Sequence, residues 1–217
     1  GDSAQNAVGD TAAGNIWDNF DARVTGAATL SESAAGNNIM HYTLPSLVDD
    51  LTVAVSYTPA GANDESSSAF GLTYAGVEGL SVSYGQDSAD GDAVGSGGTT
   101  ANSDTTSLKA SYAIGSFTLA YSDHDHDSNT DTSDQTATSW KVSYTVSDAV
   151  SVTYGTESLD SAATADTPDA EYTKITASHT SGGMTVSANY QEAEQMSYTT
   201  ATDEDEEYVG LSVSFAF

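Results

Sequence analysis

Segments in which apolar and small polar residues alternate recur along this chain, and they constrain its fold more than any other feature. Five of them end on tyrosine: LTVAVSY (51–57), LSVSY (80–84), FTLAY (117–121), VSVTY (150–154) and MTVSANY (184–190). Each follows a partner of the same kind: IMHYTL (39–44), AFGLTY (69–74), SLKASY (107–112), SWKVSY (139–144) and TKITASH (173–179). Such alternation indicates β-strands with one apolar and one polar face. With YVGLSVSFAF (208–217), the sequence predicts an all-β chain of eleven antiparallel strands.

The tyrosines of these segments fall into two rows in register with the apolar face. One row contains Tyr42, Tyr74, Tyr112 and Tyr144, and the other contains Tyr57, Tyr84, Tyr121, Tyr154 and Tyr190. Phenolic rings prefer a membrane–water boundary, so two rows predict two interfaces on a transmembrane sheet. The alternative is a soluble β-sandwich with tyrosines in its core. That fold would require more Ile, Leu and Phe at these positions.

The predicted connections alternate between short and long. Short turns are expected at 45–50, 76–79, 114–116, 146–149 and 181–183, and long loops at roughly 59–67, 86–103, 123–135, 158–171 and 192–206. This alternation is typical of bacterial outer-membrane barrels, which have periplasmic turns and longer extracellular loops. The long loops hold most of the acidic residues, including the run DHDHD at 123–127.

Composition excludes several functions. The chain has 4 Lys and Arg against 32 Asp and Glu, a formal net charge of −28, so we expect no nucleic-acid partner. It has no cysteine, and its 4 histidines have no Ser or Cys partner suited to nucleophilic catalysis, so we expect neither a disulfide nor an enzyme. No apolar run approaches the ~20 residues that a membrane-spanning helix needs.

The C-terminal strand and one earlier stretch resemble a known family. The strand ends on an aromatic-x-Phe pair, Phe215 and Phe217, which resembles the assembly signal of outer-membrane barrel proteins. Residues 37–57 resemble the general porin pattern, with Asp50 where that pattern usually has glycine. The resemblance implies a homotrimer in the outer membrane of a Gram-negative bacterium, surrounded by its lipids. It also implies a water-filled channel for passive diffusion of small hydrophilic solutes, without a cofactor.

General porins have about sixteen strands, so the resemblance implies that about five strands are absent from this chain, whether cleaved, supplied by another chain or unassigned. It also divides the chain into a pore-constriction loop (1–37) and barrel strands (38–217). An open sheet edge in lipid is not tolerated, which supports further strands. In the alternative, residues 19–30 form a strand that closes a twelve-stranded barrel.

In this family the constriction loop places carboxylates opposite basic side chains of the barrel wall. By resemblance, the candidate carboxylates are Asp18, Asp21 and Glu32, with Asp10 a weaker candidate. Arg23 lies among them, either as a cation of the constriction or as a partner of Asp21. We therefore expect a channel that prefers cations.

The three lysines alternate with apolar neighbours. Lys109, Lys141 and Lys174 follow or precede Leu108, Trp140 and Ile175, so they are predicted to face the lumen. A lysine facing lipid near the midplane would cost ~2–4 kcal/mol. These lysines either line the pore or merely neutralise nearby acids.

A function of another class stays open: a secreted or cell-surface acidic β-protein, such as an adhesin or surface-layer component, that binds calcium. Asp123, Asp125 and Asp127 are weak metal candidates. Consecutive alternating residues do not converge on one ion, so we expect at most loosely bound Ca²⁺ at the acidic loops.

Overall fold

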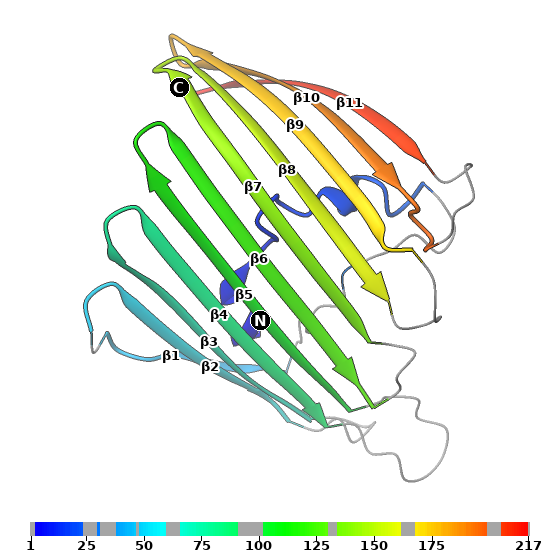
Figure 1. Ribbon diagram of the computed structural model, residues 1–217. Coiled ribbons are helices and arrows are strands. Elements are labelled where there is room, and N and C mark those ends of the chain that lie inside the picture. The colour runs from blue at the N-terminus through cyan, green and yellow to red at the C-terminus, as the bar shows by residue number, and fades with distance from the viewer. Residues whose placement is uncertain are drawn as a thin grey trace.

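The structure, a computed structural model, describes residues 3–23, 30, 38–46, 48–59, 66–90, 102–129, 134–161, 168–198 and 205–216. Eleven antiparallel strands form one curved sheet in which each strand pairs with its sequence neighbours (Figure 1). They are β1 (Met40–Thr43), β2 (Leu51–Thr58), β3 (Ser66–Val77), β4 (Leu80–Asp90), β5 (Ser103–Ile114), β6 (Phe117–Ser128), β7 (Gln135–Ser147), β8 (Val150–Ser161), β9 (Ala170–Ser181), β10 (Met184–Glu194) and β11 (Glu206–Phe215). The predicted all-β class and strand count are confirmed.

Two short 3₁₀ helices precede the sheet, η1 (Ala4–Val8) and η2 (Ile16–Asn19). Residues 20–23, which continue from η2, form a turn rather than a strand. The alternative strand at 19–30 is therefore wrong for residues 19–23, and residues 24–29 lie outside the described part. None of the helices among the described residues is long and apolar enough to cross a membrane.

Several strands extend beyond their predicted ends. The expected loops at 86, 123 and 158 begin instead after β4, β6 and β8, which end at Asp90, Ser128 and Ser161. The acidic run at 123–127 is paired with β5 from Leu108 to Asp104, so its assignment to a loop is wrong. Backbone pairing continues here because the ladder does not require apolar side chains, whereas the predicted end followed the loss of apolar residues.

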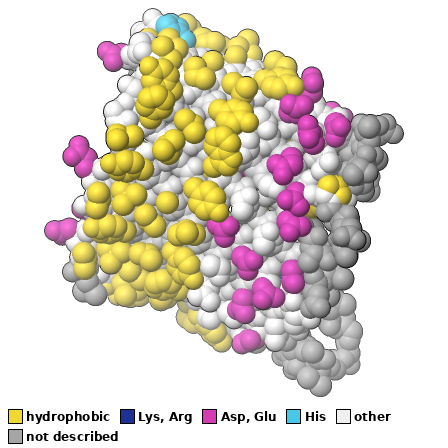
Figure 2. All heavy atoms as spheres, viewed as in Figure 1, with side chains coloured by type: hydrophobic (Ala, Val, Ile, Leu, Met, Phe, Trp, Pro, Cys, Tyr) yellow, Lys and Arg dark blue, Asp and Glu magenta, His cyan; other side chains and the backbone are white. Residues whose placement is uncertain are grey.

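The outward face of the sheet is apolar over a broad band (Figure 2). Large exposed side chains there include Tyr57, Leu108, Tyr121, Trp140, Tyr154, Ile175, Val209 and Leu211. Tyr121 pairs with Trp140, and the ring centroids of Trp140 and Tyr154 are 5.2 Å apart, so aromatic side chains of β6, β7 and β8 adjoin on this face. In the row nearer the short turns, the rings of Phe117 and Tyr144 stack with centroids 4.6 Å apart.

The outward face changes character at the long-loop ends of the strands. Asp123 shares this face with Tyr121, whose hydroxyl donates to its carboxylate at 3.3 Å. Acidic side chains lie beside the apolar band in Figure 2. By strand alternation, Asp104, Asp125 and Asp127 also take outward positions. These four aspartates therefore lie on the outward face of the sheet and not on the side that its curvature encloses.

The backbone conformation of one turn explains how Asp50 can replace the glycine of the porin-like pattern. This residue adopts a positive φ of 60°, and its carbonyl accepts a hydrogen bond from the amide of Ala75 at 3.0 Å. Left-handed backbone favours glycine, and aspartate is among the residues that tolerate it best. The substitution in the porin-like pattern therefore keeps the turn.

The sheet is open. Within the described residues, β1 pairs only with β2 and β11 only with β10, so the two outer strands do not meet. Each outer strand leaves one row of backbone donors and acceptors without a strand partner.

Candidate functional site

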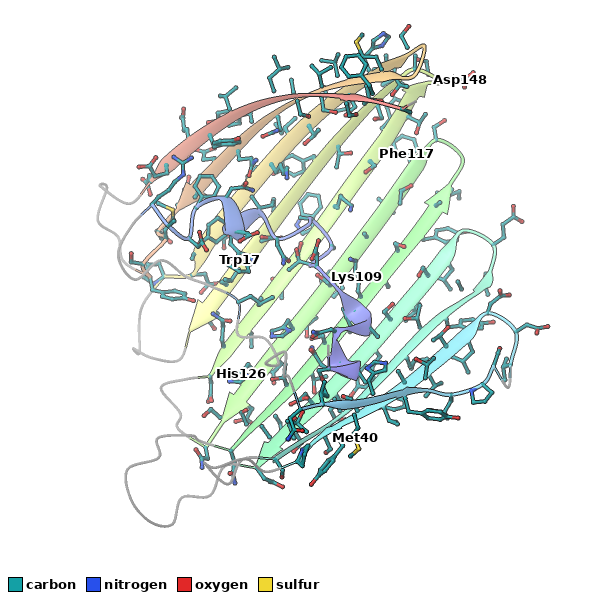
Figure 3. All side chains as sticks on the ribbon, turned by 180° about the vertical axis from the view of Figure 1, so that it is seen from behind. Trp17, Met40, Lys109, Phe117, His126 and Asp148 are labelled. Carbon is teal, nitrogen blue, oxygen red and sulfur yellow. The ribbon has the colours of Figure 1, made fainter. Side chains whose placement is uncertain are left out.

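Residues 3–23, here called the inner segment, cross the inner face of the curved sheet (Figure 3). Helix η1 contacts β2, β3, β4 and β5, and η2 contacts β8 and β9. The segment thus spans much of the sheet and occupies space that the curvature encloses.

Hydroxyl groups of successive strands hold the backbone of the inner segment. The amides of Ala4, Ala12 and Ala13 donate to the Oγ atoms of Ser56, Ser122 and Ser139 at 2.8, 2.8 and 2.9 Å. The side chain of Gln5 donates to Ser107 Oγ at 2.6 Å. An irregular segment has no ladder to satisfy its amides, so side-chain acceptors from the wall fulfil that need. The small polar residues of the inner face therefore fix the path of the segment.

Glu157 on β8 is the main anchor at the centre of this contact. Its side chain is 1% exposed. It accepts a hydrogen bond from the hydroxyl of Thr11 and another from the amide of Trp17 at 3.2 Å. A buried carboxylate is stable only where such donors surround it. Sequence analysis missed Glu157, although a lone carboxylate on a face of small polar residues is a visible signal.

Glycines on the wall make room for the segment. A Cβ atom at Gly71 would collide with the carbonyl oxygen of Ala4, and one at Gly85 with that of Gln5. At Gly155 it would lie 2.9 Å from the Cβ of Ala13. Each of these glycines lies where the segment approaches the wall.

An apolar cluster secures the C-terminal half of the segment. Ile16 and Phe20 pack on Leu159, Ala170 and Tyr172 of the inner face, together with Ala137, Ala193 and Met196. Tyr172 is 1% exposed, and its ring lies 5.9 Å from that of Phe20, centroid to centroid. Leu159 and Tyr172 break the polar pattern of their strands, which is the sequence signal for this contact.

A turn after β10 folds inward against the same cluster. Met196 is completely buried, and the Tyr198 hydroxyl accepts a hydrogen bond from Gln135 Nε2 at 3.0 Å. Burial raises the pKa of Tyr198 above its ordinary value, and the charges of Asp160 and Asp169 add to the increase. The bond from Gln135 acts in the opposite direction. The inner segment is therefore held from two sides.

The structure places the candidate constriction residues as follows. Asp10, Asp18 and Asp21 are exposed on the inner segment. Arg23 pairs with Glu206 at 3.6 Å and lies over the rings of Phe20 and Tyr208, rather than pairing with Asp21. Glu32 lies outside the described residues, so its role stays a prediction.

The three lysines lie on the inner face of β5, β7 and β9. Lys109 Nζ donates to the backbone carbonyl of Asp10 at 2.7 Å, and Figure 3 shows it beside the inner segment. Lys141 and Lys174 both pair in register with Gly155 of β8 and are half-buried. Phe215 lies exposed at the end of β11, and Phe217 is outside the described part.

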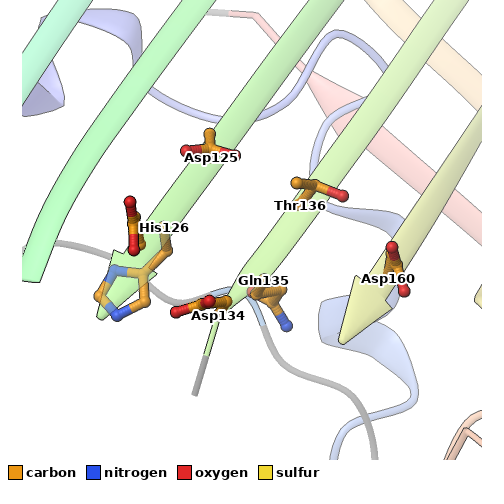
Figure 4. Close-up of a pocket in the computed structure, with 7 residues that line it drawn as sticks. Asp125, His126, Asp134, Gln135, Thr136 and Asp160 are labelled. Carbon is orange, nitrogen blue, oxygen red and sulfur yellow. The ribbon is translucent and has the colours of Figure 1, made fainter. Parts of the chain in front are cut away.

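The weak metal candidates share one face of a strand. Asp123, Asp125 and Asp127 lie two residues apart on β6, with roughly 6.5 Å between neighbouring Cα atoms. A cavity of about 260 Å³ at the long-loop ends of β6, β7 and β8 contains Asp125, Asp134 and Asp160 with His126 (Figure 4). No group of three His, Asp or Glu side chains in the described ranges could hold a metal ion.

Comparisons with known proteins agree with this architecture. The sequence model of the Gram-negative porin family matches residues 1–182. The structure resembles a loop L8 deletion mutant of OmpT, an outer membrane protein of Vibrio cholerae, with a TM-score of 0.57 and 15% identity over 88% of this chain and 70% of that one. It also resembles an anion-selective porin from Comamonas acidovorans, with a TM-score of 0.59 and 17% identity over 81% of this chain and 54% of that one. No curated protein sequence matches the chain.

Proposed function

Because the chain belongs to the Gram-negative porin family, we propose that it forms the wall of a water-filled channel for passive diffusion of small hydrophilic solutes and ions. The protein is located in the outer membrane of a Gram-negative bacterium. The observation that carries the proposal is the inner segment, held across a polar inner face by Ser56, Ser122, Ser139 and Glu157 while the opposite face is apolar. A sheet with water on one side and lipid on the other needs this division.

The complete channel requires more strands than the sheet contains. The edges of β1 and β11 would expose unpaired backbone groups to lipid, which costs several kcal/mol per group. We propose that further strands, from this polypeptide or another chain, join these edges. The chain spans 70% and 54% of the two similar structures, consistent with a partial barrel. Assembly as a homotrimer is likewise a proposal based on the family.

The proposed charge preference is modest and favours cations. At ~0.15 M salt the Debye length is ~8 Å, so charges on the outward face have little effect on ions in the lumen. Asp10, Asp18 and Asp21 are exposed on the inner segment and would attract cations. Lys141 and Lys174 oppose them, which limits the preference. The similar porin from Comamonas acidovorans is anion-selective.

The family assignment favours the channel over a secreted calcium-binding β-protein. We propose that the channel needs no cofactor and that any Ca²⁺ at the acidic strand ends is loosely bound.

The direct test is conductance of the purified protein in a planar bilayer, with the zero-current potential measured across a salt gradient. We expect stepwise ohmic conductance and a potential whose sign corresponds to cation flow. Protein that stays folded in detergent until it is boiled is correctly assembled. If such protein shows no conductance, the channel is refuted. An anion-sign potential would refute only the charge preference.

A further inference from the structure

Basic residues are scarce in this protein, and most of them gather in one place. Only 4 of the 217 residues are Lys or Arg. Lys141 and Lys174 flank Gly155 across three adjacent strands, and Gly155 adds no side chain between them. The charge of Lys109, on β5, also acts on Lys141. Three lysines therefore form a positive patch on the inner face of a strongly acidic chain.

A cavity of about 240 Å³ lies at this patch. Lys141 and Lys174 line it together with the hydroxyl-bearing side chains of Ser143, Thr153 and Thr176, and Ala13 of the inner segment. The Ser143 and Thr153 hydroxyls lie 3.0 Å apart and share a hydrogen bond. A water molecule takes about 30 Å³ in the liquid, so the cavity has room for a small hydrated ion.

The two lysines at this cavity lack the kind of close partner that Lys109 has. In the described part of the chain, neither ammonium group lies within ion-pair distance of a carboxylate. The charge of Glu157 acts on Lys174 at longer range, while its oxygens accept direct bonds from Thr11 and Trp17. Lys109 differs, because its ammonium donates to the carbonyl of Asp10. A direct ion pair with a described acid therefore does not account for Lys141 and Lys174.

We propose that this cavity is a lumenal subsite for small multivalent oxyanions of the phosphate class. Lysine ammonium groups bind phosphate as point charges, and hydroxyl groups can donate to its remaining oxygens. Multivalent anions are favoured because two lysine side chains line one cavity. The proposal rests on the proposed channel function, since the channel would bring the anion to the subsite.

The test is pyrophosphate binding to the detergent-purified protein, measured by isothermal titration calorimetry at a series of fixed ionic strengths. We expect saturable binding that weakens as salt rises. Loss of one charge-assisted contact should weaken binding about tenfold or more, so Lys141→Gln and Lys174→Gln should each have this effect. Lys109→Gln is the matched control and should have a smaller effect, because its ammonium already has a partner.

Conductance separates this proposal from the channel itself. Pyrophosphate should reduce single-channel current, and the Lys141→Gln/Lys174→Gln double variant should conduct with little block. Binding without conductance would retain the subsite and refute the channel. Absence of binding, or equal binding in the wild type and the double variant, would overturn the subsite even in a conducting protein.

Discussion

The hydroxyl of Thr11 donates a hydrogen bond to the buried carboxylate of Glu157, which lies 146 residues later in the chain. The amide of Trp17 donates to the same carboxylate at 3.2 Å. A single side chain of β8 thus holds both ends of the stretch between η1 and η2. This contact links the width of the proposed pore to one residue of its wall.

Replacing Glu157 should loosen the inner segment. In Glu157→Ala, the Thr11 hydroxyl and the Trp17 amide lose their acceptor, at a cost of ~1–3 kcal/mol in unfolding free energy. We expect larger and noisier single-channel conductance. We also expect the folded band on gels to be replaced by the unfolded band at a lower temperature. Glu171→Gln is the control, because Glu171 is an exposed carboxylate that accepts a hydrogen bond from the Ser158 hydroxyl at 3.0 Å. Equal conductance in wild type and Glu157→Ala would contradict this role.

Side chains added at the wall glycines should displace the start of the inner segment. Gly71→Val and Gly85→Val would collide with the backbone of Ala4 and Gln5. Overpacking of this kind costs ~1–3 kcal/mol. We expect altered conductance with preserved strand content by circular dichroism. Ala75→Val, at an exposed position of β3, is the control and should conduct like the wild type. Normal conductance in both glycine variants would show that the segment does not set the pore width.

The two tryptophans should report opposite faces of the sheet. Trp140 is 43% exposed on the outward face, whereas Trp17 packs against the inner apolar cluster. In vesicles with brominated acyl chains, the Trp17→Phe variant retains Trp140 alone. We expect the bromine atoms to quench its fluorescence strongly. Trp140→Phe should leave fluorescence that the bromine atoms hardly quench. Similar quenching in both variants would contradict the assignment of the faces.

The exposed acids of the inner segment should control the charge preference more than those of the outward face. Asp18→Asn/Asp21→Asn should shift the zero-current potential toward anions, because these carboxylates lie within a Debye length of the proposed ion path. Asp125→Asn/Asp127→Asn removes the same charge from outward positions and should shift the potential less. Equal shifts would overturn the mechanism, although not the channel.

The turn at Asp50 should tolerate glycine and reject β-branched residues. Its φ of 60° is left-handed, a conformation that costs an ordinary residue roughly 1–2 kcal/mol and a β-branched one more. Asp50→Gly should match the wild type in thermal stability. Asp50→Val should lower the temperature at which the folded band on gels is replaced by the unfolded band. Equal stability of the two variants would count against strain at this turn.

Local patterns predicted much of this fold. The two-residue period located all eleven strands because alternation of side chains is a property of each strand alone. It also assigned the lysines to the polar face, since Lys109, Lys141 and Lys174 each adjoin an outward apolar residue. The strand ends were less predictable: β6 continues through its acidic run because hydrogen bonding to β5 does not depend on side-chain polarity.

The sequence by itself determined the class of the fold and the two faces of the sheet, because these depend on spacing along the chain. Only the tertiary structure decided that Glu157 receives Thr11, that Arg23 pairs with Glu206, and that Lys141 and Lys174 share a cavity beside Gly155. These contacts join residues far apart in sequence, and they depend on strand register and on the path of an irregular segment with no periodicity to read.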